Sequence, residues 1–183
     1  MVIHDHEPRR PDPGGGFTLV ELAAVMVIVG IIAGTAVVSL SSVGSKRSAM
    51  AARQLQRDMT YARQRAVATG TRSWIQFDTV GQTWTVKVED LVSPGRATSL
   101  VLTDPATGGP FVQPMNTGSF VGVTMTVTFA DGPDWIGFDW LGRPLREDTE
   151  ATPLSADGLV VFSGGESVTV DKNTGHTVFV PAP

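Results

Sequence analysis

The sequence predicts an α+β protein in which one long N-terminal helix packs on a C-terminal antiparallel β-sandwich. Three observations support this prediction. An apolar stretch occupies residues 17–40, apolar side chains recur at helical spacing in residues 41–70, and residues 71–183 form short alternating runs separated by turn residues. A chain of 183 residues is long enough for one compact domain and an anchor.

The apolar stretch at residues 17–40 contains a single charged residue, Glu21. As a helix it would extend about 36 Å, which exceeds the hydrocarbon thickness of a bilayer, about 30 Å. We therefore expect a transmembrane helix at residues 17–40. The sequence contains no second stretch of this kind, so the protein is predicted to cross the membrane once.

Residues 1–16 are predicted to stay in the cytoplasm. Arg9 and Arg10 lie close to the apolar stretch, and positive charges favour the cytoplasmic side. The C-terminal domain is then expected on the opposite side of the membrane. The prolines and glycines of residues 8–16 stop the helix from extending backward and leave an extended segment that a protease can bind.

Glu21 is the unusual residue of the apolar stretch. A secretory signal peptide or a plain anchor would have no need of it, and a carboxylate at the centre of a membrane helix costs about 2.5–3.5 kcal/mol, less near an end. Cleavage before Phe17 would create a positive α-amino group four residues from Glu21. That amino group could belong to the same chain or to a neighbouring subunit.

The run GFTLVE at residues 16–21, followed by an apolar stretch, resembles the prepilin cleavage and methylation motif of type IV pilin-like proteins. This resemblance implies that a membrane aspartic peptidase cuts after Gly16, that the same enzyme N-methylates Phe17, and that Glu21 supports methylation and subunit recruitment. Residues 1–16 are then a cleaved cytoplasmic leader. The leader is unusually long and rich in Pro and Gly, and the membrane stretch lacks the proline that many relatives carry.

We call residues 41–70 the stem and expect an amphipathic continuation of the helix there. Its small and apolar side chains recur at steps of three and four residues and form one narrow stripe: Ala52, Leu55, Met59, Ala62 and Ala66. Gly70 is placed as a C-cap. The stem is therefore predicted to pack through this stripe on the domain that follows.

The stem is basic, whereas the rest of the chain, which we call the head (residues 71–183), is acidic. Residues 46–72 contain seven basic residues and one acid, Asp58, while residues 73–183 contain five basic residues and thirteen acids. The candidate contact residues of the stem are Arg53, Arg57 and Arg63. They could pair with acids on neighbouring subunits or bind DNA phosphates. The half-buried helix and the acidic head favour the first interpretation.

The head is predicted to contain seven or eight mostly antiparallel strands in two packed sheets. The expected strands are 74–77, 83–88, 121–129, 135–138, 159–162, 168–170 and 177–180. Residues 171–175 are expected to form a hairpin loop, and residues 94–96 and 103–118 to be loops. The tryptophans, Trp135 and Trp140 among them, are predicted to be core residues.

No reaction chemistry is predicted. The absence of cysteine excludes disulfides, thiolate metal sites and cysteine nucleophiles, and two of the three histidines fall in the leader. Asp131, Asp134 and Asp139 lack the order of a calcium-binding loop and are interpreted as turn acids. We therefore expect no enzyme activity, no cofactor and no metal site.

The order of helix and sandwich, together with residues 136–144 and 168–178, resembles the H-type minor pseudopilins of type II secretion and the related FimT-like minor pilins. This implies a structural subunit at or near the tip of a short filament that takes part in protein secretion. The implied partners are a prepilin peptidase/methyltransferase, other pseudopilins, the inner-membrane assembly platform and membrane lipid. The implied location is the inner (cytoplasmic) membrane, with the C-terminal domain in the periplasm or outside the membrane. The alternative is a FimT-like pilin that binds DNA for uptake, although residues 175–183 contain no Lys or Arg.

Overall fold

The computed structural model describes residues 17–115, 117–129, 134–145 and 154–183, without the side chains of residues 35–42. The predicted leader, including Gly16, lies outside the described residues. The chain divides into two compact units, Met1–Leu40 and Ser41–Pro183, and each is described by itself. Helix α1 (Leu19–Thr69) contributes residues to both units.

In the first unit, helix α1 begins directly after Thr18. The Thr18 hydroxyl accepts a hydrogen bond from the backbone N–H of Glu21 at 3.2 Å, which is the bond of a helix N-cap. All residues from Phe17 to Gly34 are exposed. Among the described residues, no helix has the length and hydropathy needed to cross a membrane. The predicted membrane helix at residues 17–40 includes residues 35–40, whose side chains lie outside the description.

In the second unit, the stem part of α1 buries the predicted stripe. Ala52, Leu55, Met59, Ala62 and Ala66 are each 0% exposed, which confirms the helical spacing. The helix ends at Thr69, and Gly70 follows with a φ of +67°, as expected of a C-cap glycine. A residue with a Cβ would be strained in this left-handed conformation.

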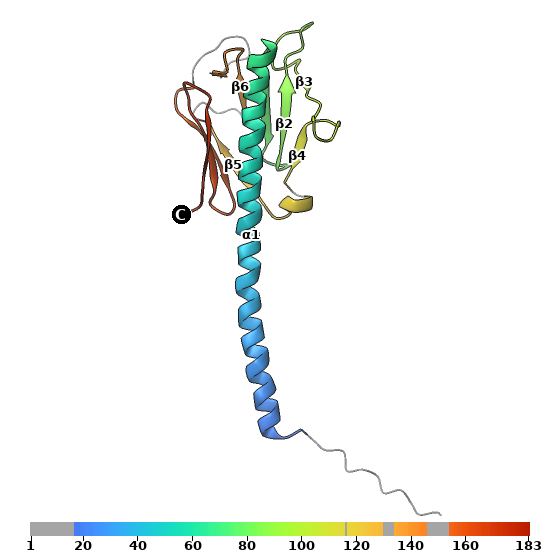
Figure 1. The fold of residues 1–183 in the computed structure, drawn as a ribbon, viewed down its shortest axis with the longest axis vertical. Helices are drawn as coiled ribbons and strands as arrows, with labels where there is room; N and C mark the ends of the chain where they lie inside the picture. The colour runs from blue at the N-terminus through green and yellow to red at the C-terminus, as the bar shows by residue number, and fades with distance from the viewer. Residues whose placement is uncertain (1–16, 116, 130–133, 146–153) are drawn as a thin grey trace, which may run out of the picture. The chain divides into compact units, whose positions relative to one another are not determined.

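A six-stranded antiparallel sheet packs on one side of the stem. Its strand order is β3-β2-β1-β6-β7, with β4 also paired to β2. The strands are β1 (Ser73–Asp78), β2 (Thr83–Val88), β3 (Leu100–Val101), β4 (Val112–Pro114), β6 (Trp135–Phe138) and β7 (Pro144–Leu145). Figure 1 shows β2 and β4 of this sheet beside the stem part of α1.

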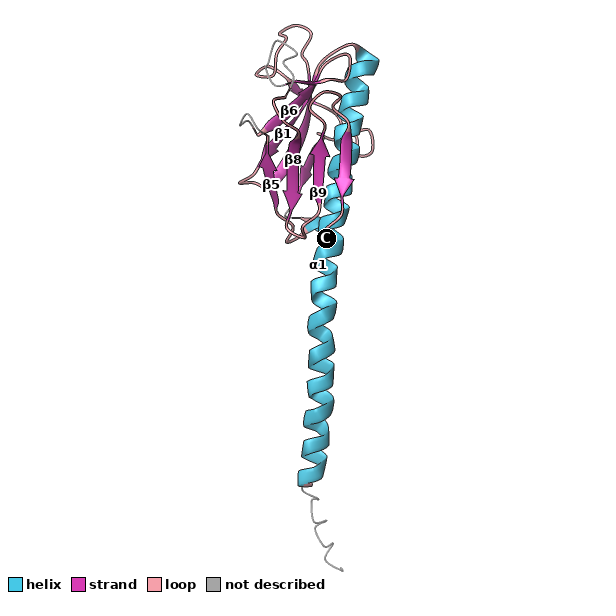
Figure 2. Cartoon of the chain, turned by 90° about the vertical axis from the view of Figure 1, so that its left-hand side faces the viewer, coloured by secondary structure: helices cyan, strands magenta, loops and turns pink. Residues whose placement is uncertain are grey.

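A four-stranded antiparallel sheet completes the head, with the strand order β10-β9-β8-β5. Its strands are β5 (Met125–Thr128), β8 (Gly158–Phe162), β9 (Ser167–Val170) and β10 (Thr177–Val180). Figure 2 shows β5, β8 and β9 of this sheet side by side. Residues 171–175 form the predicted hairpin loop, since β9 and β10 pair directly across it.

One hydrophobic core joins the stem to both sheets. It contains the stripe of α1, Ile75, Trp84 and Ile136 of the larger sheet, and Val160 and Val168 of the smaller sheet. Polar bonds also hold the stem: Ser73 donates its hydroxyl to the carbonyl of Ala62, and the N–H of Gly164 donates to the Ser48 hydroxyl. The α+β prediction, with a helix packed on antiparallel sheets, is therefore confirmed.

The prediction was wrong at several strand boundaries. The expected strand at 121–129 is reduced to β5, because a 3-10 helix, η1 (Gly118–Phe120), and a turn with Gly122 at φ +83° precede it. The expected loop at 103–118 contains β4. Two-residue strands such as β3 and β7 carry no periodic signal, so the described residues contain ten strands instead of seven or eight.

The tryptophan prediction was correct for two residues, whereas Trp135 is only half-buried and a fourth tryptophan is exposed. Trp74 and Trp84 are fully buried, whereas Trp140 is 55% exposed at the turn between β6 and β7. Asp139 of the same turn is a turn acid as predicted. Its carboxylate accepts the backbone N–H groups of Leu141 and Arg143 and pairs with the Arg143 guanidinium at 2.7 Å. Asp131 lies outside the described residues.

Candidate functional site

The first candidate site is the start of α1, where Phe17 and Glu21 are exposed. Glu21 lies in the first turn, where the positive end of the helix dipole favours a carboxylate. Thr18 and Glu21 also have the spacing of a capping box, which is recognisable from the sequence. Within the described residues, the Glu21 carboxylate makes no ion pair, so it is available to a charged partner. Gly16 lies outside the description.

The second candidate site is a row of exposed side chains along the stem: Lys46, Met50, Arg53, Arg57 and Gln64. Their spacing places them on one face of the helix. The Arg53 guanidinium lies over the ring of Phe179 at 5.0 Å, and Arg57 donates from Nη2 to Oε1 of Gln54 at 2.6 Å. Neither arginine pairs with a carboxylate of the described chain, so both charges remain available at the surface.

Arg63 lies apart from this row. Its Nε donates to the carbonyl of Gly142 at 2.8 Å and to that of Thr174 at 3.2 Å. These carbonyls belong to the turn after β6 and to the loop before β10, so Arg63 links both sheets to the stem. The structure thus brings Arg53 and Arg57 together but gives the third candidate arginine an internal contact.

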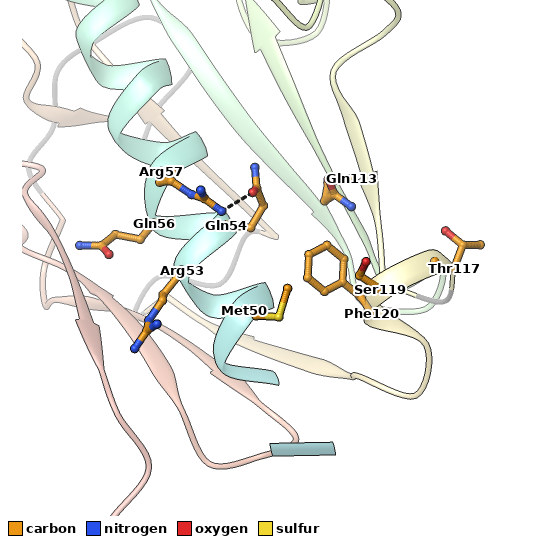
Figure 3. A pocket seen from close by; sticks show the side chains of 10 residues that line it. Met50, Arg53, Gln54, Gln56, Arg57, Gln113, Thr117, Ser119 and Phe120 are labelled. Carbon is orange, nitrogen blue, oxygen red and sulfur yellow. Dashed lines mark hydrogen bonds between the residues drawn. The ribbon is translucent and has the colours of Figure 1, made fainter. Parts of the chain in front are cut away.

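A groove lies between the row and the end of β4. Its volume is about 730 Å³, and Arg53 and Arg57 line it from the stem. Figure 3 shows Met50 and Phe120 facing each other across the groove, with Gln113 on the far side. Two smaller hollows of about 330 and 270 Å³ continue past Tyr61 and Gln64 toward the end of α1. The site therefore offers an apolar spot bordered by cations and amides.

Asp58 is a buried acid of the stem whose role the sequence analysis missed. It is 3% exposed, and its carboxylate accepts the indole N–H of Trp84 at 2.9 Å and the amide of Gln54 at 2.8 Å. Burial raises the pKa of Asp58 to about 6, although the bonds to Trp84 and Gln54 oppose this rise. Asp58 lies three residues after Leu55 and four before Ala62, on the same helix face as the stripe. This spacing alone predicts that its side chain is buried.

The bonds of Asp58 connect the core to the groove. Gln54 donates its amide N–H to Asp58 and accepts a hydrogen bond from Arg57 through its amide oxygen. The orientation of the Gln54 amide is thus fixed at both ends. The chain of bonds from Trp84 through Asp58 and Gln54 therefore positions the Arg57 guanidinium at the groove.

The turn between β6 and β7 presents a further exposed apolar surface. Trp140 and Leu141 are half exposed there, and Val67 of α1 is exposed to a similar extent. The Asp139 carboxylate and the Arg63 bond to Gly142 hold the turn in place. Across all the described residues, no group of three or more His, Cys, Asp or Glu side chains could hold a metal ion.

Neither a family model nor a curated protein matches this sequence. Two solved structures of the minor pseudopilin EpsH, from the type II secretion system of Vibrio cholerae, are similar in fold. One has a TM-score of 0.54 and 12% identity and covers 76% of this chain and 96% of its own. The other has a TM-score of 0.52 and 10% identity and covers 74% of this chain and 97% of its own. The chain has a type IV pilin-like fold.

The type IV minor pilin FimU of Pseudomonas aeruginosa aligns more weakly, with a TM-score of 0.43, 14% identity, and coverage of 72% of this chain and 91% of its own. The conclusion about the fold rests on the two EpsH structures. They confirm at the level of fold the resemblance inferred from the sequence, namely a pilin-like helix packed on antiparallel sheets.

Proposed function

We propose that this protein is a minor pseudopilin, a structural subunit at or near the tip of a type II secretion pseudopilus. The observation that carries this proposal is the pilin-like packing of the stem on two antiparallel sheets, which it shares with EpsH over about three quarters of the chain. In this role the protein catalyses no reaction. Its partners are other pseudopilins, the assembly platform and the prepilin peptidase/methyltransferase.

The exposed apolar surface of the first unit supports this proposal. The helix is apolar on all sides from Leu19 to Gly34 apart from Glu21, and every one of these residues is exposed. A helix of this kind needs an apolar environment around its whole circumference. The inner membrane supplies it before assembly, through a helix at residues 17–40, and neighbouring subunits supply it in the filament.

Cleavage of the chain before Phe17 gives Glu21 its partner. The new α-amino group of one subunit pairs with Glu21 of its neighbour, which offsets the desolvation of both charges only when the subunits assemble. Thr18 fixes the first turn of α1 and so holds the Glu21 backbone in place for this contact. Glu21 thereby helps to set the axial offset between subunits.

The test is to determine the N-terminus of the protein extracted from membranes of its host, with and without an active prepilin peptidase. The expected chain begins at methylated Phe17 when the peptidase is active and retains residues 1–16 when it is not. The small residues AGTA at 33–36 resemble the cleavage site of a secretory signal peptide, and a chain that begins after them contradicts the proposal.

A second candidate function is DNA binding for uptake, as in a FimT-like minor pilin. The exposed cations Lys46, Arg53 and Arg57 favour it, because such a row can neutralise phosphates and release counterions. The acidic head opposes it. A gel-shift assay with duplex DNA decides: salt-sensitive retention that is lost on changing Arg53 and Arg57 supports this function, and no retention by the unaltered protein rejects it.

A further inference from the structure

We infer that Asp58, Gln54 and Arg57 form a pH-dependent switch, in which protonation of Asp58 turns over the Gln54 amide and releases Arg57 at the groove. The switch lies entirely within the second unit. It goes beyond the proposed function, because it operates whether or not the chain enters a filament.

The hydrogen bonds around Asp58 are those of its ionised form. Oδ1 accepts from the Gln54 amide at 2.8 Å, and Oδ2 accepts from the Trp84 indole N–H at 2.9 Å. The Gln54 amide oxygen in turn accepts from Nη2 of Arg57 at 2.6 Å. A guanidinium only donates and a carboxylate only accepts, so this orientation of the Gln54 amide satisfies both of its neighbours.

Protonation of Asp58 removes this match. A neutral carboxyl group carries one O–H donor, and its proton cannot lie between Oδ2 and Trp84, because the indole N–H is itself a donor. Trp84 cannot turn away, since it is 0% exposed and packed in the core. The proton is therefore carried by Oδ1, where the O–H of Asp58 and the amide N–H of Gln54 face each other as two donors.

A half-turn of the Gln54 amide resolves this conflict. The rotation brings the amide oxygen to Asp58 and the amide N–H group to Arg57, which has no acceptor to offer. The bond to Asp58 is partly buried, whereas the bond to Arg57 is exposed. Water can replace the exposed bond, but a buried O–H without an acceptor is costly. The buried contact therefore decides the orientation, and Arg57 is released.

The surroundings of Asp58 set the pH at which the switch operates. Burial is the largest cause that raises the pKa of Asp58 to about 6, and the bonds from Trp84 and Gln54 oppose it. Among the charged groups, Arg57 of the same helix lowers the pKa, while Asp104 of the loop after β3 raises it. Strand β2 contributes only the neutral Trp84 to this contact. The bonds of the ionised form therefore predominate above about pH 6, and the turned amide predominates below it.

The groove changes with this switch, because Gln54 and Arg57 both line it. Above the midpoint, the Arg57 guanidinium is held against Gln54. Below the midpoint it is free to move, and the stem gains one positive charge, since Asp58 is the only acid of residues 46–72. The groove thus presents a fixed cation at neutral pH and a mobile one in acid, which is a local charge change with a structural readout.

The experiment follows side-chain N–H signals of the nitrogen-15-labelled full-length chain in detergent by NMR. The pH runs from about 4 to about 8, on both sides of the pKa of Asp58. We expect the Trp84 indole N–H and the Arg57 Nε–H to shift with one common midpoint near pH 6. Trp84→Phe and Arg57→Lys assign these two signals.

Asp58→Asn tests the direction of the switch. Its amide oxygen can accept from Trp84, so that its own N–H group faces Gln54, as the O–H of the protonated acid does. Both signals should therefore stay near their acid positions at every pH. Signals that stay at their neutral positions in Asp58→Asn would overturn the inference.

Gln54→Met tests the relay, because it replaces the amide by an apolar side chain of similar length. The Trp84 signal should still titrate, while the Arg57 signal should lose most of its shift. Gln64→Met makes the same change on the exposed face of the stem and is the matched control, which should leave both titrations unchanged. Tryptophan fluorescence verifies that each variant keeps its fold.

Three further results would overturn the inference. The first is a Trp84 signal in the unaltered protein that does not titrate in this range. The second is a Trp84 signal that titrates while the Arg57 signal stays constant. The third is an Arg57 signal that titrates equally in Gln54→Met, because the charge of Asp58 would then act on Arg57 directly and not through the amide.

Discussion

Helix α1 carries one acid in each of its two parts, and the surroundings of these acids are opposite. Asp58 of the stem is buried and accepts hydrogen bonds from Trp84 and Gln54 within the chain. Glu21, in the exposed apolar part, has no ion pair among the described residues. The comparison teaches that the chain satisfies one carboxylate by its own folding and leaves the other for a partner.

The largest expected effect comes from removing the proposed partner of Glu21. Gly16→Val should block leader cleavage, so that no α-amino group forms at Phe17. We expect the chain to accumulate in membranes with residues 1–16 attached and to be absent from sheared filaments. Immunoblots of both fractions measure this. A Gly30→Val variant is the control for a bulkier residue in the same unit. Normal incorporation of the uncleaved chain into filaments would contradict the claim that Glu21 needs the new α-amino group.

The second largest effect is expected from shortening one apolar side chain in each part of α1. Leu55→Ala removes a fully buried side chain and should lower the free energy of unfolding by about 2–5 kcal/mol. Val25→Ala, on the exposed part, should change it by less than about 0.5 kcal/mol. Denaturant unfolding followed by tryptophan fluorescence reports on the head, where all four tryptophans lie. Equal losses of unfolding free energy in both variants would contradict the assignment of Leu55 to the buried part of α1 and Val25 to its exposed part.

The buried acid should make stability depend on pH. The pKa of Asp58 is about 6 in the folded protein, against 3.8 for an ordinary aspartate, so the folded state binds the proton more tightly. The resulting stabilisation is fully present below about pH 3.8 and is lost as pH rises through about 6. The difference corresponds to about 3 kcal/mol between these limits.

Asp58→Asn isolates this effect, because it removes the ionisation and keeps an oxygen for Trp84. The free energy of unfolding of the unaltered protein should fall relative to that of the variant between pH 4 and pH 7. Denaturant titrations at several pH values measure the difference. Parallel curves for the two proteins would show that Asp58 is not the group responsible.

The smallest effect concerns the end of α1. Gly70 has a φ of +67°, a conformation that strains any residue with a Cβ, so Gly70→Ala should destabilise the head by about 1 kcal/mol. The same fluorescence assay measures it. Ala68→Gly, inside the last turn, is a control that acts by helix propensity instead, and a stabilised Gly70→Ala variant would contradict the cap.

The sequence predicted those parts of the molecule that have a regular period. The stripe from Ala52 to Ala66 and the alternation of Thr83–Val88 were correct because one face of each element is buried. Strands β3, β4 and β7 were not predictable in this way, since two or three residues show no period and form only by pairing with a longer neighbour.

The candidate site was predictable in its charges but not in its contacts. The basic stem and the exposed positions of Arg53 and Arg57 follow from sequence and helical spacing. The groove does not, because Phe120 and Gln113 come from segments more than fifty residues away in sequence. Arg63 also required the structure, since its carbonyl partners belong to two turns of the head.

The most direct test of the central claim compares the two acids in one assembly experiment. Glu21→Ala and Asp58→Asn are expressed in the host, and the share of each protein in sheared filaments is measured against the unaltered chain. We expect Glu21→Ala to be lost from filaments while it remains in the membrane, and Asp58→Asn to be incorporated normally. Normal incorporation of Glu21→Ala would contradict the claim that this carboxylate is left for a neighbouring subunit.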